Sequence, residues 1–227
     1  MAKLVVFGAS GMIGSRVLTE ALERGHHVVA VVRDPAKLAR NDAQLNDTNL
    51  SDPNLTVESG DVTDPAIVTR VTRDADAVIA CVSRRGPGLD QTAAYRQVGE
   101  SLIDGLRELG TAAPPLVITG GAGSLEVAPG QRLVDQPGFP DVYKSEALAH
   151  AELLDWCRGV RDVRWAYASP AAEIAPGERT GEFRLGEDTL LSDESGKSFI
   201  SAEDFAIALV DEAESGAHLG ARFTAAY

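Results

Sequence analysis

Residues 4–14 read LVVFGASGMIG, an apolar run that passes directly into a glycine-rich turn. The run from Leu4 to Phe7 has no polar side chain, which is typical of a strand buried on both faces of a sheet. From Met12 to Arg24 apolar residues recur at helical spacing, and Gly25 follows as a helix terminator. This stretch therefore predicts a strand, a turn and a helix.

The three glycines of the turn have separate roles in a phosphate-binding loop. Gly8 allows a sharp turn, Gly11 allows the backbone to approach a pyrophosphate, and Gly14 allows the helix to pack close to the sheet. The helix N-terminus then faces the negative charge. A tight turn without a ligand can contain the same glycines. Here a clear strand precedes them and a clear helix follows, and this context favours dinucleotide binding.

Strand and helix patterns alternate along the rest of the chain. They predict strands at residues 28–32, 55–58, 77–82, 116–119 and 163–168. They predict helices that start at Asp64-Pro65, span 91–109 and about 142–158, and start again at Ser201. Such alternation is typical of a mostly parallel sheet with right-handed crossovers and helices on both faces. We therefore expect a Rossmann-like, doubly wound α/β fold.

The whole chain, residues 1–227, is expected to form a single NAD(P)-binding domain, because no linker divides it. Residues from about 170 to 227 would complete the substrate side, with short strand-like pieces at 182–185 and 189–191 and an edge strand at 222–225. A polar stretch at 40–54 reads as a surface loop. Ligands of such sheets bind beyond the carboxyl ends of the strands. The loops expected to meet there span 8–14, 33–34, 60–62, 81–90, 119–141 and 169–180.

Charge and cysteine content limit the partners of the chain. The formal net charge is −13, and such a surface repels nucleic-acid backbones and anionic lipid. Neither Cys81 nor Cys157 lies in a metal-ligand or CxxC spacing, so two free thiols in a reducing compartment are expected. No segment is long and apolar enough to span a bilayer. The predictions are a cytoplasmic protein, no metal, no nucleic-acid or membrane partner, and a small-molecule substrate.

Arg33 and Asp61 bear on the choice and placement of the cofactor. An acid after the second strand would bind the ribose of NAD, whereas an arginine there can meet the 2′-phosphate of NADP. Arg33 therefore favours NADP(H). Asp34 is the alternative partner of Arg33 and would itself serve NAD(H). Asp61 follows the third strand and has two open readings: acceptor for the adenine amino group, or turn aspartate that bonds its own backbone.

Several motifs stand in the order found in a known family. They are Gly8-xx-Gly11-xx-Gly14, Val31 to Leu38, Gly60 to Pro65 and Asp76 to Ile79, followed by Ser169 to Ala171 and Ile200 to Ala206. Together they resemble the atypical short-chain dehydrogenase/reductase family, which includes NmrA-like proteins, biliverdin-reductase-B-like flavin reductases and NAD(P)H-binding reductases. The resemblance covers nearly the whole chain. Its N-terminal half is specific for the cofactor, and its C-terminal half only for the family.

The resemblance also implies which residues contact the cofactor. Besides the three glycines, the lining residues would be Ser10, Met12, Ile13, Arg33, Asp61, Val62, Cys81 and Val82. Thr119, Pro170 and Ala171 would lie near the nicotinamide end.

The catalytic tyrosine of short-chain reductases is acidified by a lysine four residues later. This chain has Tyr143, but position 147 is alanine, and Lys144 points about 100° around the helix. Tyr143 and Thr119 remain the catalytic candidates, with Ser124 as a second assisting hydroxyl. A partly buried tyrosine at a helix start is the alternative for Tyr143.

His150 lies seven residues beyond Tyr143 on a similar helical face. It is either a more distant proton donor or an ordinary helix histidine. A triad of Ser124, Asp135 and His150 is rejected, because no nucleophile elbow accompanies it.

Three functions are compatible with this sequence. The first is an NADPH-dependent reductase that transfers hydride to a small planar acceptor such as a flavin, quinone or carbonyl compound. The second is a non-catalytic NADP(H) sensor of the NmrA type with a protein partner, which the missing lysine supports equally well. The third, a nucleotide-sugar epimerase, is weakened because such enzymes of this superfamily keep the tyrosine–lysine pair and have a larger C-terminal region.

Overall fold

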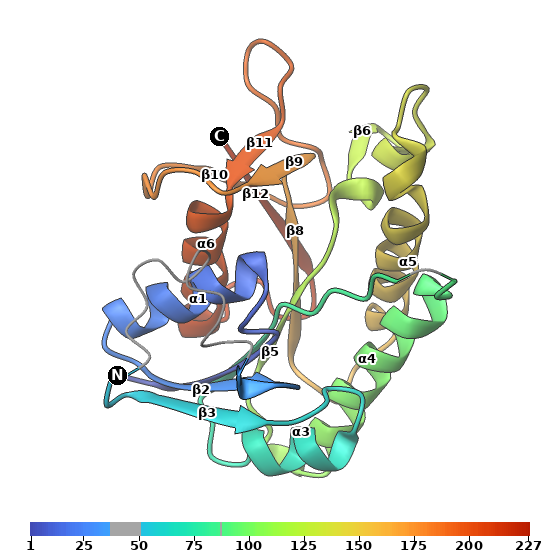
Figure 1. Cartoon of the computed structure of the whole chain (residues 1–227). Coiled ribbons are helices and arrows are strands. Elements are labelled where there is room, and N and C mark those ends of the chain that lie inside the picture. The colour runs from blue at the N-terminus through green and yellow to red at the C-terminus, as the bar shows by residue number, and fades with distance from the viewer. Residues whose placement is uncertain (37–50, 87) are drawn as a thin grey trace.

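The computed structural model describes residues 1–36, 51–86 and 88–227 (Figure 1). Its main sheet has the strand order β10-β12-β8-β5-β4-β1-β2-β3. The strands are β1 (Lys3–Phe7), β2 (His27–Val32), β3 (Leu55–Ser59), β4 (Ala77–Ala80), β5 (Leu116–Thr119), β8 (Trp165–Pro170), β10 (Arg184–Gly186) and β12 (Arg222–Ala226). Every pairing in this sheet is parallel except that of β10 with β12. The predicted mostly parallel, Rossmann-like α/β fold is confirmed.

Helices cover both faces of the sheet (Figure 1). One face carries α1 (Met12–Glu23) and α6 (Ala202–Ser215), and the other carries α3 (Pro65–Thr72), α4 (Gln91–Arg107) and α5 (Asp141–Cys157). Each face has its own apolar core, because alternate residues of every buried strand point to opposite sides. Along β1, for example, Leu4 and Val6 belong to one core, while Val5 and Phe7 belong to the other.

The helices predicted to start at Asp64-Pro65 and at Ser201 form there, and each has a side-chain N-cap. Asp64 is the N-cap of α3 and accepts a hydrogen bond from the Ala66 N–H, with Pro65 in the first turn. Ser201 is the N-cap of α6, and its hydroxyl accepts from the Asp204 N–H at 3.0 Å.

The C-terminal strand lies elsewhere than predicted. β12 is an interior strand between β8 and β10, so the expectation of an edge strand at 222–225 is wrong. The piece predicted at 182–185 overlaps β10, which begins at Arg184 and covers the free side of β12 by antiparallel pairing. Residues 189–191 form only an isolated bridge, between Thr189 and Glu126. The position of β12 in the sheet depends on its pairing with β8 and β10, and the sequence pattern of one strand does not reveal its partners.

Two small sheets lie beyond the carboxyl edge of the main one. β9 (Glu173–Ala175) pairs with β11 (Phe199–Ser201), and β6 (Glu126–Ala128) pairs with β7 (Gln131–Arg132). Short 3-10 helices η2 (Ala122–Ser124) and η3 (Leu133–Asp135) accompany the second pair, and η1 (Gly110–Ala112) follows α4. Most of the polar stretch at 40–54, together with Lys37 and Leu38, falls outside the described residues. None of the helices in the described ranges has the length and apolar character needed to cross a membrane.

Candidate cofactor and substrate site

The glycine turn joins β1 to α1 at the carboxyl edge of the sheet. The Gly8 N–H donates to the Val31 carbonyl at 3.3 Å, and the Gly11 N–H donates to the Gly8 carbonyl at 3.0 Å. Gly11 is the N-cap of α1, yet no side chain caps that helix end. Its first-turn N–H groups therefore form the kind of donor set that an anion binds at a helix N-terminus.

Packing around the turn leaves no room for side chains at two of the three glycines. Gly8 has φ +77°, and a Cβ there would lie 2.2 Å from the Cys81 carbonyl oxygen. A Cβ on Gly14 would lie 2.2 Å from the Gly8 carbonyl oxygen. Gly11 is different, because it is exposed and a Cβ there would meet only the Gly8 oxygen, at 3.3 Å. Two glycines hold the turn tight while the third leaves its surface open, as a pyrophosphate cradle requires.

Arg33, Asp61 and Arg84 meet at one end of this edge. Arg33 is exposed after β2, and both arginines lie within electrostatic range of the Asp61 carboxylate. One Asp61 oxygen accepts from the N–H and the hydroxyl of Thr63, at 3.0 and 2.9 Å. The Thr63 N–H is the main cause of a lowered Asp61 pKa. One Asp61 oxygen therefore bonds within its own turn, as a turn aspartate does. Adenine recognition by this residue stays a prediction.

Residues after β4, β5 and β8 lie at the other end. The Cys81 sulfur and the Thr119 hydroxyl oxygen are 3.4 Å apart, and burial raises the pKa of the Cys81 thiol to about 12. Thr119 is buried, and Val82 is partly exposed. The remaining predicted residues divide by burial: Ser10, Met12 and Ile13 are partly exposed on the turn, whereas Val62, Pro170 and Ala171 are buried. Both cysteines are free thiols.

Position 147 is closed to the missing lysine. Ala147 is buried on α5, and a Cβ on Gly123 would lie 2.6 Å from the Ala147 methyl group. The 3-10 helix η2 thus packs where a lysine side chain would have to pass. Tyr143 lies in the first turn of α5 with 55% of its surface exposed, and its catalytic role stays a prediction.

A polar network that the sequence did not indicate lies beside Tyr143. The Tyr95 hydroxyl donates to Glu146 at 2.7 Å, and the Arg85 guanidinium pairs with the same carboxylate at 2.8 Å. Burial opposes ionisation of Glu146, but these two hydrogen bonds lower its pKa. Burial and the Glu146 carboxylate raise the pKa of Tyr95 to about 12. Tyr95 and Arg85 lie 51 and 61 residues before Glu146 in the sequence, so no local pattern could have revealed these contacts.

His150 belongs to the interior of this network. Its ring lies 4.2 Å from the Tyr95 ring between centroids, and burial lowers its pKa to about 4. The Tyr167 hydroxyl donates to the His150 carbonyl at 2.9 Å and lies 3.3 Å from Nδ1. Because that hydroxyl has one hydrogen, Nδ1 is the donor of the second contact. With its lowered pKa, the imidazole is neutral at neutral pH. The ring is packed between neighbours, as a structural histidine would be.

The other hydroxyl and acid considered with His150 have separate partners. Ser124 accepts from the buried Arg222 guanidinium at 2.7 Å, and Asp135 pairs with Arg132 at 2.8 Å. No triad forms. Within the described ranges, no group of three or more His, Cys, Asp or Glu side chains is arranged to hold a metal ion.

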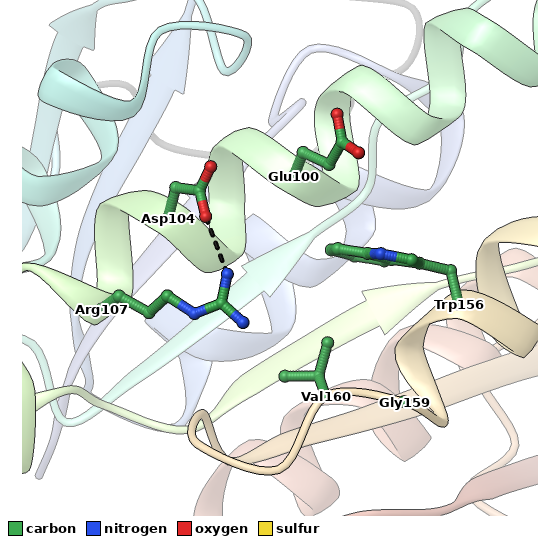
Figure 2. Close-up of a pocket in the computed structure, with 6 residues that line it drawn as sticks. All are labelled: Glu100, Asp104, Arg107, Trp156, Gly159 and Val160. Carbon is green, nitrogen blue, oxygen red and sulfur yellow. Dashed lines mark hydrogen bonds and ion pairs between the residues drawn. The ribbon is translucent and has the colours of Figure 1, made fainter.

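A cavity of about 360 Å³ lies between α4 and α5, near the C-terminal ends of both helices (Figure 2). It is lined by Glu100, Asp104, Arg107, Trp156, Gly159 and Val160. These helices start at the carboxyl edge, so the cavity lies at the opposite edge from the glycine turn. The Arg107 guanidinium is already paired with Asp104 and Asp162. The cavity is therefore not the candidate cofactor site.

Comparison with known families agrees with this geometry. Residues 8–215 match a family described as NAD(P)H-binding. The match begins at the first glycine of the turn and ends with the last residue of α6. The chain belongs to this NAD(P)H-binding family.

Three solved structures extend the similarity over the whole chain. A proposed exported protein from Burkholderia pseudomallei is 43% identical, with 100% of both chains covered and a TM-score of 0.83. A proposed epimerase from Bacteroides thetaiotaomicron is 37% identical, with 100% of this chain and 97% of that one covered and a TM-score of 0.86. A proposed NADH-flavin reductase from Streptococcus pneumoniae is 30% identical, with 100% and 99% covered and a TM-score of 0.79. The three proteins share the fold of this chain, but their names do not agree on one activity.

Proposed function

We propose that this protein is an NADPH-dependent oxidoreductase that reduces a small planar acceptor such as a flavin, quinone or carbonyl compound. The observation that carries the proposal is the tight three-glycine turn at the carboxyl edge of the sheet in a chain of the NAD(P)H-binding family. The flavin reductase proposed for the Streptococcus pneumoniae relative supports the flavin option. The motifs shared with the atypical short-chain reductases support the same assignment.

In this proposal the turn at Gly8, Ser10, Gly11 and Gly14 holds the pyrophosphate, and residues after β4 and β5 flank the nicotinamide end. When bound, NADPH supplies a hydride from its nicotinamide ring. Thr119 and Tyr143 would contact the acceptor. Their side chains, together with the loops after β5 and β8, orient the acceptor and exclude water from it.

The experiment that tests this function follows NADPH oxidation with panels of flavins, quinones and aldehydes, beside a direct titration of the protein with NADPH. Turnover of at least one acceptor is expected. Tight NADPH binding without turnover of any acceptor would contradict the reductase and favour a sensor with a protein partner. The closed position 147 is compatible with such a sensor, because it removes the usual acid.

Replacement of Arg33 by glutamine is expected to weaken NADPH binding about 10- to 100-fold and to leave NADH binding within about twofold. The reason is loss of the guanidinium that we propose for the 2′-phosphate. Fluorescence titration with both nucleotides measures the effect. Arg73→Gln is a matched control, because Arg73 is also exposed but follows α3 at the opposite edge. Tighter binding of NADH than of NADPH by the unmodified protein would contradict this role.

Tyr143→Phe is expected to change flavin reduction by less than about fivefold, because a reduced flavin can take its proton from solvent. A true general acid contributes about 10²- to 10⁴-fold. The measurement is kcat/KM for FMN with NADPH. A loss of 100-fold or more would identify Tyr143 as the acid and contradict this expectation.

An epimerase, as proposed for the Bacteroides relative, is disfavoured because Ala147 leaves no place for the lysine partner.

Residues 1–227 are proposed to act as one NAD(P)-binding domain. In support, β12 and β10 from the C-terminal region extend the sheet that β1 begins. The free state of both cysteines supports the proposal of a reducing compartment.

A further inference from the structure

Arg85 is an exposed arginine whose guanidinium is held by one carboxylate. It lies in the loop after β4, and 67% of its side chain is exposed. Its Nε donates to the two Glu146 oxygens at 3.0 and 2.9 Å, and Nη2 lies 2.8 Å from Oε2. Nη1 has no hydrogen-bond partner within the described ranges. One edge of the guanidinium is therefore anchored, and the rest of it faces outward.

The Glu146 anchor is largely buried and has a second partner. The Glu146 side chain is only 14% exposed, and its carboxylate also accepts from the hydroxyl of the buried Tyr95. The Tyr95 hydroxyl in turn accepts from the Arg84 N–H at 3.1 Å. A guanidinium held in advance loses less freedom when it binds an anion, and this favours a binding role.

The network leads from Arg85 to the proposed acceptor site. Beyond Glu146 and Tyr95, the His150 ring lies against the loop after β5, since a Cβ on Gly121 would lie 3.2 Å from His150 Cδ2. Arg85 also lies within electrostatic range of Tyr143. Arg84, although adjacent, interacts with Asp61 at the other end of the edge. The two arginines therefore lie near different ends of the candidate site.

We propose that Arg85 binds an anionic group, a phosphate or carboxylate, on the planar acceptor, so that the protein prefers an anionic acceptor to its neutral counterpart. This inference rests on the proposed reductase function. It follows from the charge of the chain as well as from the geometry. A protein of net charge −13 repels anions over most of its surface, so an anionic acceptor needs a local, oriented cation.

The test compares FMN with riboflavin, which share the ring system and differ in the phosphate. Equilibrium binding is measured by quenching of flavin fluorescence with saturating NADP+, and kcat/KM is measured with NADPH. We expect FMN to bind about tenfold tighter than riboflavin. In Arg85→Gln, FMN binding should weaken about tenfold and riboflavin binding should stay within about twofold.

Two further variants separate orientation from charge. Lys144→Gln removes a neighbouring exposed charge, and because Lys144 faces Asp135, the FMN preference should change by less than about twofold. Arg85→Lys keeps the charge but not the fork, so it should retain part of the preference, and added salt should reduce that part.

Several outcomes would overturn the inference. The first is equal binding of the two flavins by the unmodified protein. The second is equal weakening of FMN and riboflavin binding by Arg85→Gln. The third is a loss of the FMN preference in Lys144→Gln as large as that in Arg85→Gln. The first, accompanied by turnover of both flavins, would refute the anion site and leave the reductase function intact. Preferential FMN binding through Arg85 without turnover would support the anion site and refute the reductase.

Discussion

Gly14→Ala is expected to weaken NADPH binding at least about 100-fold and to lower the free energy of unfolding by about 1–3 kcal/mol. The added Cβ would lie 2.2 Å from the Gly8 carbonyl oxygen and 2.8 Å from its carbon. Both are backbone atoms of the turn and cannot rotate away. Helix α1 would have to move from the sheet, and its N-terminal donors would move with it. NADPH titration and urea unfolding measure the two effects.

Gly25 serves as a control for this result, and Gly11 tests the open face of the turn. Gly25→Ala places a side chain at φ +78° with nothing within 4 Å, so it should cost about 1–2 kcal/mol of backbone strain without a change in NADPH affinity. Gly11→Ala meets only the Gly8 oxygen at 3.3 Å, so the protein should fold while the open face of the turn is partly filled. Normal NADPH affinity in both Gly11→Ala and Gly14→Ala would contradict the proposed pyrophosphate site.

Asp204→Asn is expected to lower the free energy of unfolding by about 3–5 kcal/mol at neutral pH. The Asp204 carboxylate is fully buried and accepts from the N–H groups of Thr180 and Gly181 at 2.8 and 2.9 Å. It also accepts from the Tyr227 hydroxyl at 2.7 Å. An amide would turn an NH₂ group toward these donors. Asp211→Asn on the same helix is the control, because Asp211 is exposed and should change stability by less than about 1 kcal/mol.

The stabilisation by Asp204 should depend on pH in a defined direction. Burial opposes ionisation, but hydrogen bonds from Gly181, Thr180 and Tyr227 lower the Asp204 pKa below its ordinary value of 3.8. Its contribution is therefore complete above that value and is lost as the pH falls through the lower folded pKa. The difference in unfolding free energy between Asp204→Asn and the unmodified protein should be constant from about pH 5 to 8 and shrink below about pH 4. A difference that grows on acidification would contradict this assignment.

The parts of the site that follow from local sequence were predictable. The glycine turn, Arg33 after β2 and Asp61 after β3 each stand directly after a recognisable strand. The Glu146 network was not predictable, because Tyr95, Arg85 and Glu146 come from a helix, a loop and a second helix. The sequence shows directly that position 147 is alanine and not lysine. The physical reason for this, the close packing of Gly123 against Ala147, was not predictable from the sequence.

The order of the main strands and helices follows from the amino-acid sequence alone, because strands buried on both faces leave continuous apolar runs and the helices between them leave helical periods. The position of the glycine turn follows from the sequence as well, because that signal lies within one unit of strand, turn and helix. The tertiary structure alone decided that β12 is an interior strand and that Arg85 is fixed by Glu146. Strand partners and ion-pair partners far apart along the chain are selected by packing of the whole sheet, and no local pattern encodes them.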